Sequence, residues 1–78
     1  MRLIKIGRST SNNIVLNSEK VSSIHAEIIV LENGDILLED KNSQNGTYLM
    51  NKQIKPGTPV SIRRGDAVRF ADVELQWN

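Results

Sequence analysis

The chain has 78 residues, of which 38% are hydrophobic, so it can build one small core and no second one. It contains no cysteine and one histidine, which excludes a disulfide framework, a thiol nucleophile, a thiolate metal site and a histidine-rich metal site. Ten basic and nine acidic residues give a net charge of +1, which argues against bulk binding of nucleic acid. We therefore expect a single domain over residues 1–78, without a metal or cofactor.

The N-terminal segment and the apolar runs bear on location. No apolar run approaches the ~18 residues of a membrane-spanning helix, so we expect no direct membrane insertion. Residues 1–6 carry positive charge but lack the continuous apolar region of a secretory signal. The sequence therefore predicts a cytoplasmic protein, or a cytoplasmic domain of a larger one, and favours a monomer.

Short apolar, β-branched stretches alternate along the chain with glycine, asparagine and proline, which favour turns. No window of about eleven residues or more shows the 3.6-residue period of an amphipathic helix. The pattern predicts an all-β protein, a compact β-sandwich of eight or nine short antiparallel strands, with Phe70 and Trp77 in or near the core. The expected strands are Leu3–Ile6, Ile14–Leu16, His25–Leu31, Asp35–Asp40, Thr47–Leu49, Gln53–Ile54, Val60–Ile62, Ala67–Phe70 and Val73–Trp77.

The clearest local signal lies in the middle of the chain. Asn33-Gly34 separates two apolar runs, and Asn-Gly is the pair that a type I′ turn favours, because both of its central residues need φ > 0. The sequence therefore predicts an antiparallel hairpin over His25–Asp40 with a type I′ turn.

Three of the predicted loops share one chemistry. The segments Arg8–Asn13, Asn17–Ser23 and Lys41–Thr47 supply hydroxyls, amides and one arginine, with few apolar side chains. Small polar residues often do no more than form turns. If the three loops project from the same end of a sandwich, however, they form a surface rich in hydrogen-bond donors. Donors without a general base suggest binding of an anion.

These loops carry a recognisable pattern: Gly7-Arg8, then Ser22-x-x-His25, then Ser43-x-Asn45-Gly46-Thr47, with Gly65-Asp66 before a late strand. Their order and spacing from Ile6 to Trp77 resemble the forkhead-associated (FHA) domain. The resemblance implies a sandwich of the FHA/SMAD type whose loops at one end bind phosphothreonine in a partner protein.

The resemblance also implies the roles of individual residues. Arg8 and Ser22 would hold the phosphate, Asn45 the main chain of the ligand, and Gln44 occupies a position that often contacts the phosphate. Ser23 stands where the family usually has an arginine, lysine or asparagine that reaches the ligand, so its contribution is open. The residues expected to support the loops are Gly7, His25, Gly46, Thr47 and Asn51.

Three of the supporting residues have a specific expected role. Gly7 would let the backbone turn so that Arg8 faces the loops, and Gly46 would need φ > 0. His25, which as the only histidine invites a catalytic or metal role, would instead brace the loop that carries Ser22 (Asn17–Ser23, the serine loop) against its neighbour.

The family pattern is broken after Thr47, where it commonly continues x-x-Asn-Gly. Here Met50 replaces the asparagine and Asn51 the glycine. Asn51 adopts φ > 0 more readily than most residues, so we expect the turn to survive without the amide at position 50.

Three other functions remain open at this point. An FHA-like scaffold for phosphate-independent or homotypic interactions is favoured by Ser23 and Met50. A small barrel that binds single-stranded nucleic acid would need exposed aromatic residues in a basic groove, and few are available. An enzyme lacks support, because no nucleophile–base pair or paired carboxylates are evident and Asp40 and Asp66 suit strand-end and turn positions.

Overall fold

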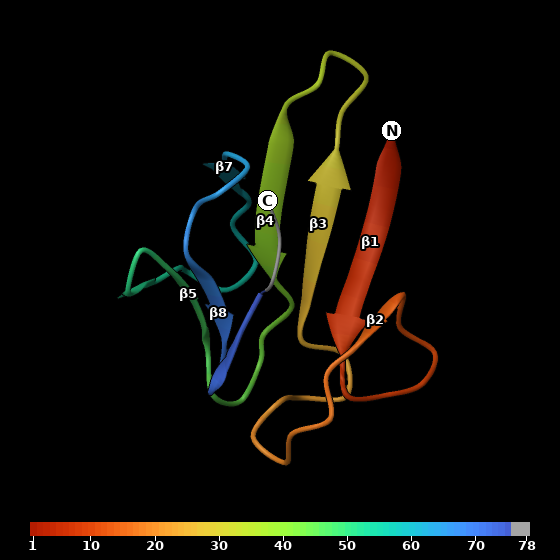
Figure 1. Cartoon of the computed structure of the whole chain (residues 1–78), viewed down its shortest axis with the longest axis vertical. Coiled ribbons are helices and arrows are strands. Elements are labelled where there is room, and N and C mark those ends of the chain that lie inside the picture. Colours follow the sequence, from red (N-terminus) through yellow and green to blue (C-terminus); the bar gives the residue numbers. More distant parts are fainter. Residues whose placement is uncertain (76–78) are drawn as a thin grey trace.

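The computed structural model describes residues 1–75, and this part of the chain forms nine strands and no helix. Their number and positions agree with the pattern of apolar stretches and turn residues, and the all-β prediction is confirmed (Figure 1). Trp77, which we expected in or near the core, lies outside the described residues. The strands are β1 (Arg2–Gly7), β2 (Ile14–Val15), β3 (Ala26–Val30), β4 (Ile36–Asp40), β5 (Thr47–Leu49), β6 (Lys52–Gln53), β7 (Val60–Ile62), β8 (Val68–Phe70) and β9 (Val73–Glu74).

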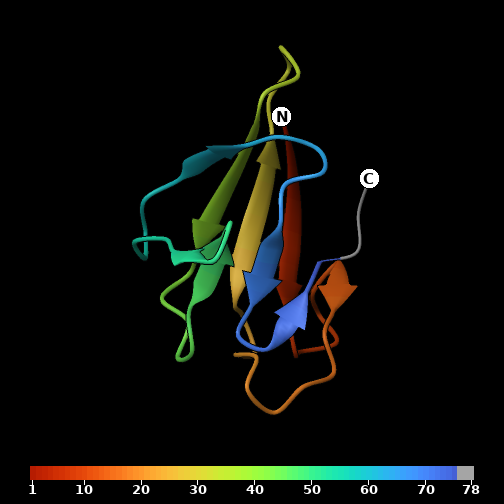
Figure 2. The ribbon, with the colours of Figure 1, turned by 60° about the vertical axis from the view of Figure 1, so that its left-hand side comes forward.

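The strands form two sheets that pack face to face. The larger has the order β2-β1-β3-β4-β7 and the smaller β6-β5-β8-β9 (Figure 2). All but one of the pairs are antiparallel, as predicted; β1 and β2 are parallel, with Ile6 opposite Ile14. The exception arises because residues 8–13 loop back past the end of β1, so that β2 starts again in the same direction.

The core lies between the sheets and is aliphatic apart from one phenylalanine. Phe70 is fully buried, as predicted, and Ile6 and Leu38 are fully buried with it. In β1, β3 and β4 every second residue faces this core, which is the two-residue period of a half-buried strand. The other core residues are Ala26, Ile28, Ile54, Ile62 and Val68.

The predicted hairpin is present, but its turn differs from the prediction. Strands β3 and β4 pair antiparallel from Ala26–Asp40 to Val30–Ile36. Of the loop residues only Gly34 has positive φ, at 94°, and its N–H donates to the carbonyl of Leu31 at 3.0 Å. The connection is therefore a three-residue loop, a type I turn followed by a left-handed glycine, and the predicted type I′ turn is wrong.

Candidate functional site

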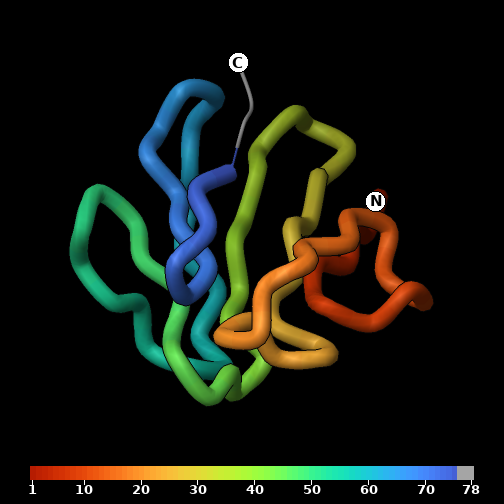
Figure 3. The backbone as a smooth tube through the Cα atoms, turned by 60° about the horizontal axis from the view of Figure 1, so that its bottom comes forward, coloured from red at the N-terminus to blue at the C-terminus, as the bar shows by residue number. Residues whose placement is uncertain are grey.

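The three polar loops lie together at one end of the sandwich (Figure 3). They follow β1, β2 and β4, and the backbone trace brings them side by side at the end opposite the β3–β4 hairpin. The expectation that these loops share one end is therefore confirmed. We refer to this region, residues 8–13, 16–25 and 41–46, as the loop end.

Arg8 lies directly beside Ser22. The Arg8 N–H donates to the Ser22 carbonyl at 2.9 Å, and the next N–H, of Ser9, donates to the Ser23 carbonyl at 3.2 Å. The Arg8 side chain is exposed, and within residues 1–75 it makes no hydrogen bond or ion pair. An arginine with all its donors available is thus held by its own backbone next to Ser22.

Gly7 is required here for close approach, which corrects the role that we predicted. It ends β1 and does not have positive φ. A Cβ at this position would lie 2.3 Å from the Ser23 carbonyl oxygen and 2.8 Å from Nδ2 of Asn12. Any side chain would therefore push the serine loop away from Arg8, so the glycine keeps the two segments in contact.

The Ser22 hydroxyl is oriented by the third loop. Its oxygen accepts the backbone N–H of Gln44 at 3.0 Å. This bond uses a lone pair and leaves the hydroxyl proton available for an acceptor outside the protein. The backbone N–H of Gln44 is therefore already bonded to Ser22, and only the exposed Gln44 side chain is available to a ligand.

His25 is completely buried and joins two of the loops. Its Nδ1 accepts the Ser22 N–H at 3.0 Å, which assigns the ring proton to Nε2, and Nε2 in turn donates to the Gly46 carbonyl at 2.9 Å. The ring also meets Phe70 edge-on, with centroids 5.9 Å apart. Gly46 has φ of +87°, so the predicted positive φ is confirmed, and its carbonyl turns toward the histidine.

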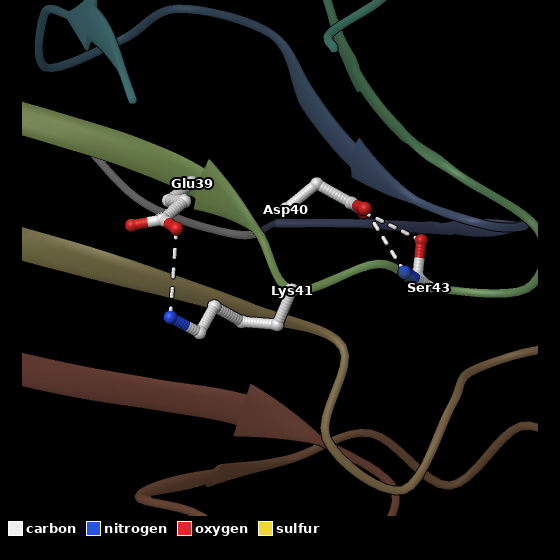
Figure 4. Close-up of polar contacts among 4 residues, drawn as sticks. All are labelled: Glu39, Asp40, Lys41 and Ser43. Carbon is white, nitrogen blue, oxygen red and sulfur yellow. Dashed lines mark hydrogen bonds and ion pairs between the residues drawn. The ribbon is translucent and has the colours of Figure 1, made fainter. Parts of the chain in front are cut away.

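A buried carboxylate organises the third loop. Asp40 is fully buried and accepts the Ser43 N–H at 2.9 Å, the Ser43 hydroxyl and, at 2.6 Å, the Thr47 hydroxyl. Figure 4 shows its carboxylate directed at Ser43, whereas the neighbouring Glu39 points to the other face of β4 and pairs with Lys41. Burial by itself would raise the pKa of Asp40, but the hydrogen bonds from Ser43 and Thr47 outweigh it and hold the pKa below the ordinary value of 3.8.

Asn45 lies at the exposed edge of the same loop and contacts the serine loop. Its Nδ2 donates to the Lys20 carbonyl at 2.7 Å. The side-chain carbonyl and the second Nδ2 proton stay available for a ligand. Ser23, which is exposed, belongs to the second loop, and its carbonyl accepts Nδ2 of Asn12 from the first loop.

Among the predicted site residues, Asn51 lies apart from the rest. It occupies the turn between β5 and β6, at the far end of β5 from Thr47, and the structure does not bring it to the loops. Its φ of 67° confirms that the turn survives, and Met50 also has positive φ, 52°.

Two buried polar residues, Asn12 and Asp40, hold the loops in a way that the sequence pattern does not indicate. Asp40 is predicted only at a strand end, which it does occupy, and Asn12 only as one of the polar residues of the first loop. Asn12 is buried and its Nδ2 donates to the carbonyls of Ser9, at 2.9 Å, and Ser23, at 2.7 Å. A signal for Asp40 exists: an acidic residue three positions before a serine at a strand end is the spacing of a side-chain-capped turn.

The residues of this end provide donors but no metal site. Within residues 1–75, no group of three or more histidine, cysteine, aspartate or glutamate side chains could hold a metal ion. In the same part of the chain no helix is long and apolar enough to cross a membrane.

Comparison with known proteins identifies the family. The sequence-family model of the FHA domain matches residues 4–71 of this chain. Among solved structures, EmbR of Mycobacterium tuberculosis in complex with a low-affinity phosphopeptide superposes with a TM-score of 0.85 at 32% identity, over 96% of this chain and 19% of that one. The N-terminal FHA domain of Rad53p from S. cerevisiae, in complex with a phosphothreonine peptide, gives a TM-score of 0.80 at 28% identity, over 86% of this chain and 54% of that one.

Curated relatives agree with this result. EmbR of Mycobacterium tuberculosis is 36% identical over 94% of this chain, and protein FraH of a Nostoc strain is 41% identical over 76% of it. This chain spans only 18% and 20% of the length of those two proteins. The match over most of the residues, together with the fold, shows that the chain belongs to the FHA domain family.

Proposed function

We propose that this domain binds phosphothreonine in partner proteins, with Arg8 and Ser22 holding the phosphate. The observation that supports the proposal is the Arg8–Ser22 backbone contact, which joins a residue whose guanidinium has no partner in residues 1–75 to a residue whose hydroxyl keeps its proton. Phosphothreonine carries a charge of about −1.5 to −2 and three acceptor oxygens, so a fixed pair of such donors suits it.

The remaining donors at this end suit the peptide around the phosphate. Asn45 can bind the ligand main chain through its side-chain carbonyl and its second amide proton, while its bond to Lys20 fixes its position. The side chains of Ser23 and Gln44 are exposed beside Ser22 and complete the surface. Gly7, His25, Gly46 and Thr47 support these loops from below, by close approach or by the hydrogen bonds described above.

The geometry favours binding over catalysis. Nδ1 of His25, the atom that would act as a base, accepts the backbone N–H of Ser22 and does not contact its hydroxyl. The serine and histidine are therefore not a nucleophile–base pair. We propose that the domain binds a phosphorylated residue and does not itself catalyse a reaction. We also propose that it acts in the cytoplasm, as a protein of its own or as a cytoplasmic domain of a larger one.

Calorimetry with a phosphothreonine peptide and the same peptide without phosphate tests this function. Two to four charge-assisted hydrogen bonds contribute about 1.5–3 kcal/mol each, and the ordering of peptide and loops offsets much of that. We therefore expect modest affinity that falls by at least ~100-fold when the phosphate is removed. Equal affinity for both peptides would support the alternative of a phosphate-independent scaffold. Arg64→Ala, at the opposite end of the sandwich, is the matched control for any arginine variant.

A further inference from the structure

A hydrogen bond outside the proposed binding residues joins the serine loop to the smaller sheet. The Ser18 hydroxyl donates to a carboxylate oxygen of Asp72 at 2.8 Å, across 54 residues of sequence. Asp72 lies in the turn between β8 and β9, and Figures 2 and 3 both show this turn against the serine loop. A bond between segments so distant in sequence fixes their relative position.

The turn that presents Asp72 is itself firmly held. Ala71, just before it, is buried and has φ of 55°, a left-handed conformation that is costly for a residue with a Cβ. The Ala71 N–H donates to the Gly46 carbonyl at 2.9 Å, the same carbonyl that accepts Nε2 of His25. Asp72 therefore projects from a turn that is anchored to the core of the loop end.

On the other side of the bond, Ser18 shapes the tip of the serine loop. Its carbonyl accepts the Val21 N–H at 3.1 Å, and its hydroxyl oxygen accepts the Lys20 N–H at 3.3 Å. The Lys20 carbonyl in turn accepts the side chain of Asn45 at 2.7 Å. Within residues 1–75 the tip, residues 18–20, thus has two hydrogen bonds to other segments: one to the proposed binding residue Asn45, and one to Asp72.

We propose that the Ser18–Asp72 hydrogen bond is a latch that holds the serine loop in its binding conformation, with Asp72 and Ser18 as positioning residues. The proposal rests on the proposed function for its effect on phosphothreonine binding. Asp72, unlike Asn45, lies outside the proposed binding surface. Its bond to Ser18 can therefore hold the loop in position before a ligand binds. Without this hydrogen bond the donors are still present, but the loop is less ordered before binding. The free energy needed to order it on binding then lowers the affinity for the ligand.

The experiment measures two properties of the full chain: affinity for a phosphothreonine peptide by calorimetry, and hydrogen exchange of the Ser22 and Gln44 amides by NMR. Those amides donate to His25 and to the Ser22 hydroxyl, so they report the arrangement of the loops without a ligand. For Asp72→Ala and Ser18→Ala we expect affinity lower by about threefold to tenfold, faster exchange of both amides and a nearly unchanged melting temperature.

Second variants separate a latch from a general structural effect. Asp72→Asn keeps an acceptor oxygen for Ser18, so it should bind like the wild type, and the Ser18→Ala/Asp72→Ala double variant should be no weaker than either single one. Ser18→Asp places two carboxylates together and should lose more affinity than Ser18→Ala, and Asp72→Asn should restore it. Asp35→Ala, an exposed carboxylate at the opposite end, is the control.

The outcomes distinguish the latch from the function on which it rests. Wild-type affinity and exchange in Asp72→Ala, or a loss in Asp72→Asn as large as that in Asp72→Ala, would overturn the latch. If the wild type binds the phosphorylated and the unphosphorylated peptide equally well, the proposed function fails. In that case the exchange rates of the Ser22 and Gln44 amides in Asp72→Ala still decide whether the latch holds the loop.

Discussion

The two ends of the sandwich are held together in different ways. At the loop end, side-chain hydrogen bonds join residues far apart in sequence: Gln44 with Ser22 across 22 residues, and Asn45 with Lys20 across 25. At the opposite end they join neighbours, as in the bonds between Asn33 and Asp35. The loop end therefore behaves as one unit, whereas the bonds between Asn33 and Asp35 hold the β3–β4 turn alone.

Burial follows the same division. Within residues 1–75, the buried polar side chains are Asn12, His25, Asp40 and Thr47, and all four support the loop end. A buried polar group is costly unless its hydrogen bonds are made, and in the described residues every such side-chain atom has a partner. A network of this kind costs a great deal to break, so we expect a change to one of these four buried side chains to alter stability and binding together, and a change to an exposed side chain of the β3–β4 turn to alter neither.

His25→Ala gives the largest expected effect and tests this coupling directly. It removes both ring hydrogen bonds and the contact with Phe70, leaving the Ser22 N–H and the Gly46 carbonyl without their partner. We expect the free energy of unfolding to fall by about 2–4 kcal/mol and phosphopeptide binding to be lost as well. Urea unfolding and calorimetry measure the two. The matched variant at the opposite end, Asn33→Ala, should change stability by less than about 0.5 kcal/mol; if His25→Ala resembled it, the bracing role would be wrong.

Arg8→Ala and Ser22→Ala separate ligand contacts from loop support. The Arg8 side chain contacts nothing by hydrogen bond or ion pair in residues 1–75, so its loss should leave the melting temperature unchanged. We expect affinity for a phosphothreonine peptide to fall by at least ~100-fold, because a charge-assisted bidentate contact is lost. Ser22→Ala should also abolish binding with the fold intact. Retained binding in Arg8→Ala would show that the cation lies elsewhere.

The sequence predicts the strands and the loops of this fold well, and the polar interior poorly. Strands follow from short apolar runs between turn residues, which is local information. The predicted type I′ turn is wrong because Asn33-Gly34 fits two loop lengths. The parallel β1–β2 pair is not predicted because the residues of the two strands do not by themselves set the direction of pairing. The burial of Asn12 and Asp40 depends on which segments the sheets bring together. The spacing from Asp40 to Ser43 indicates the turn that Asp40 caps, but it does not reveal that either residue is buried.

Acid should remove the part of the fold's stability that comes from Asp40. The pKa of Asp40 is lowered in the folded protein, so the unfolded chain binds its proton first as the pH falls. The stabilisation from this carboxylate is therefore complete above the ordinary value of 3.8 and is lost as the pH falls through the lower folded value. Thermal unfolding from about pH 5 to about pH 2 should show this loss in the wild type and a smaller one in Asp40→Asn. Identical slopes would mean that other carboxylates carry the acid sensitivity.

The smallest predicted effect is a gain in stability at a turn outside the loop end. Met50 and Asn51 both have positive φ, the type I′ geometry, in which Asn-Gly is preferred. Met50 is 58% exposed, so replacing it sacrifices little burial. We expect Met50→Asn/Asn51→Gly to stabilise the fold by about 1 kcal/mol and raise the melting temperature by about 4–8 °C. The same residues two positions on, Lys52→Asn/Gln53→Gly, should destabilise it, because β6 needs extended backbone. Phosphopeptide affinity should stay the same in the turn variant; a change in affinity would show that the β5–β6 turn is coupled to the loop end after all.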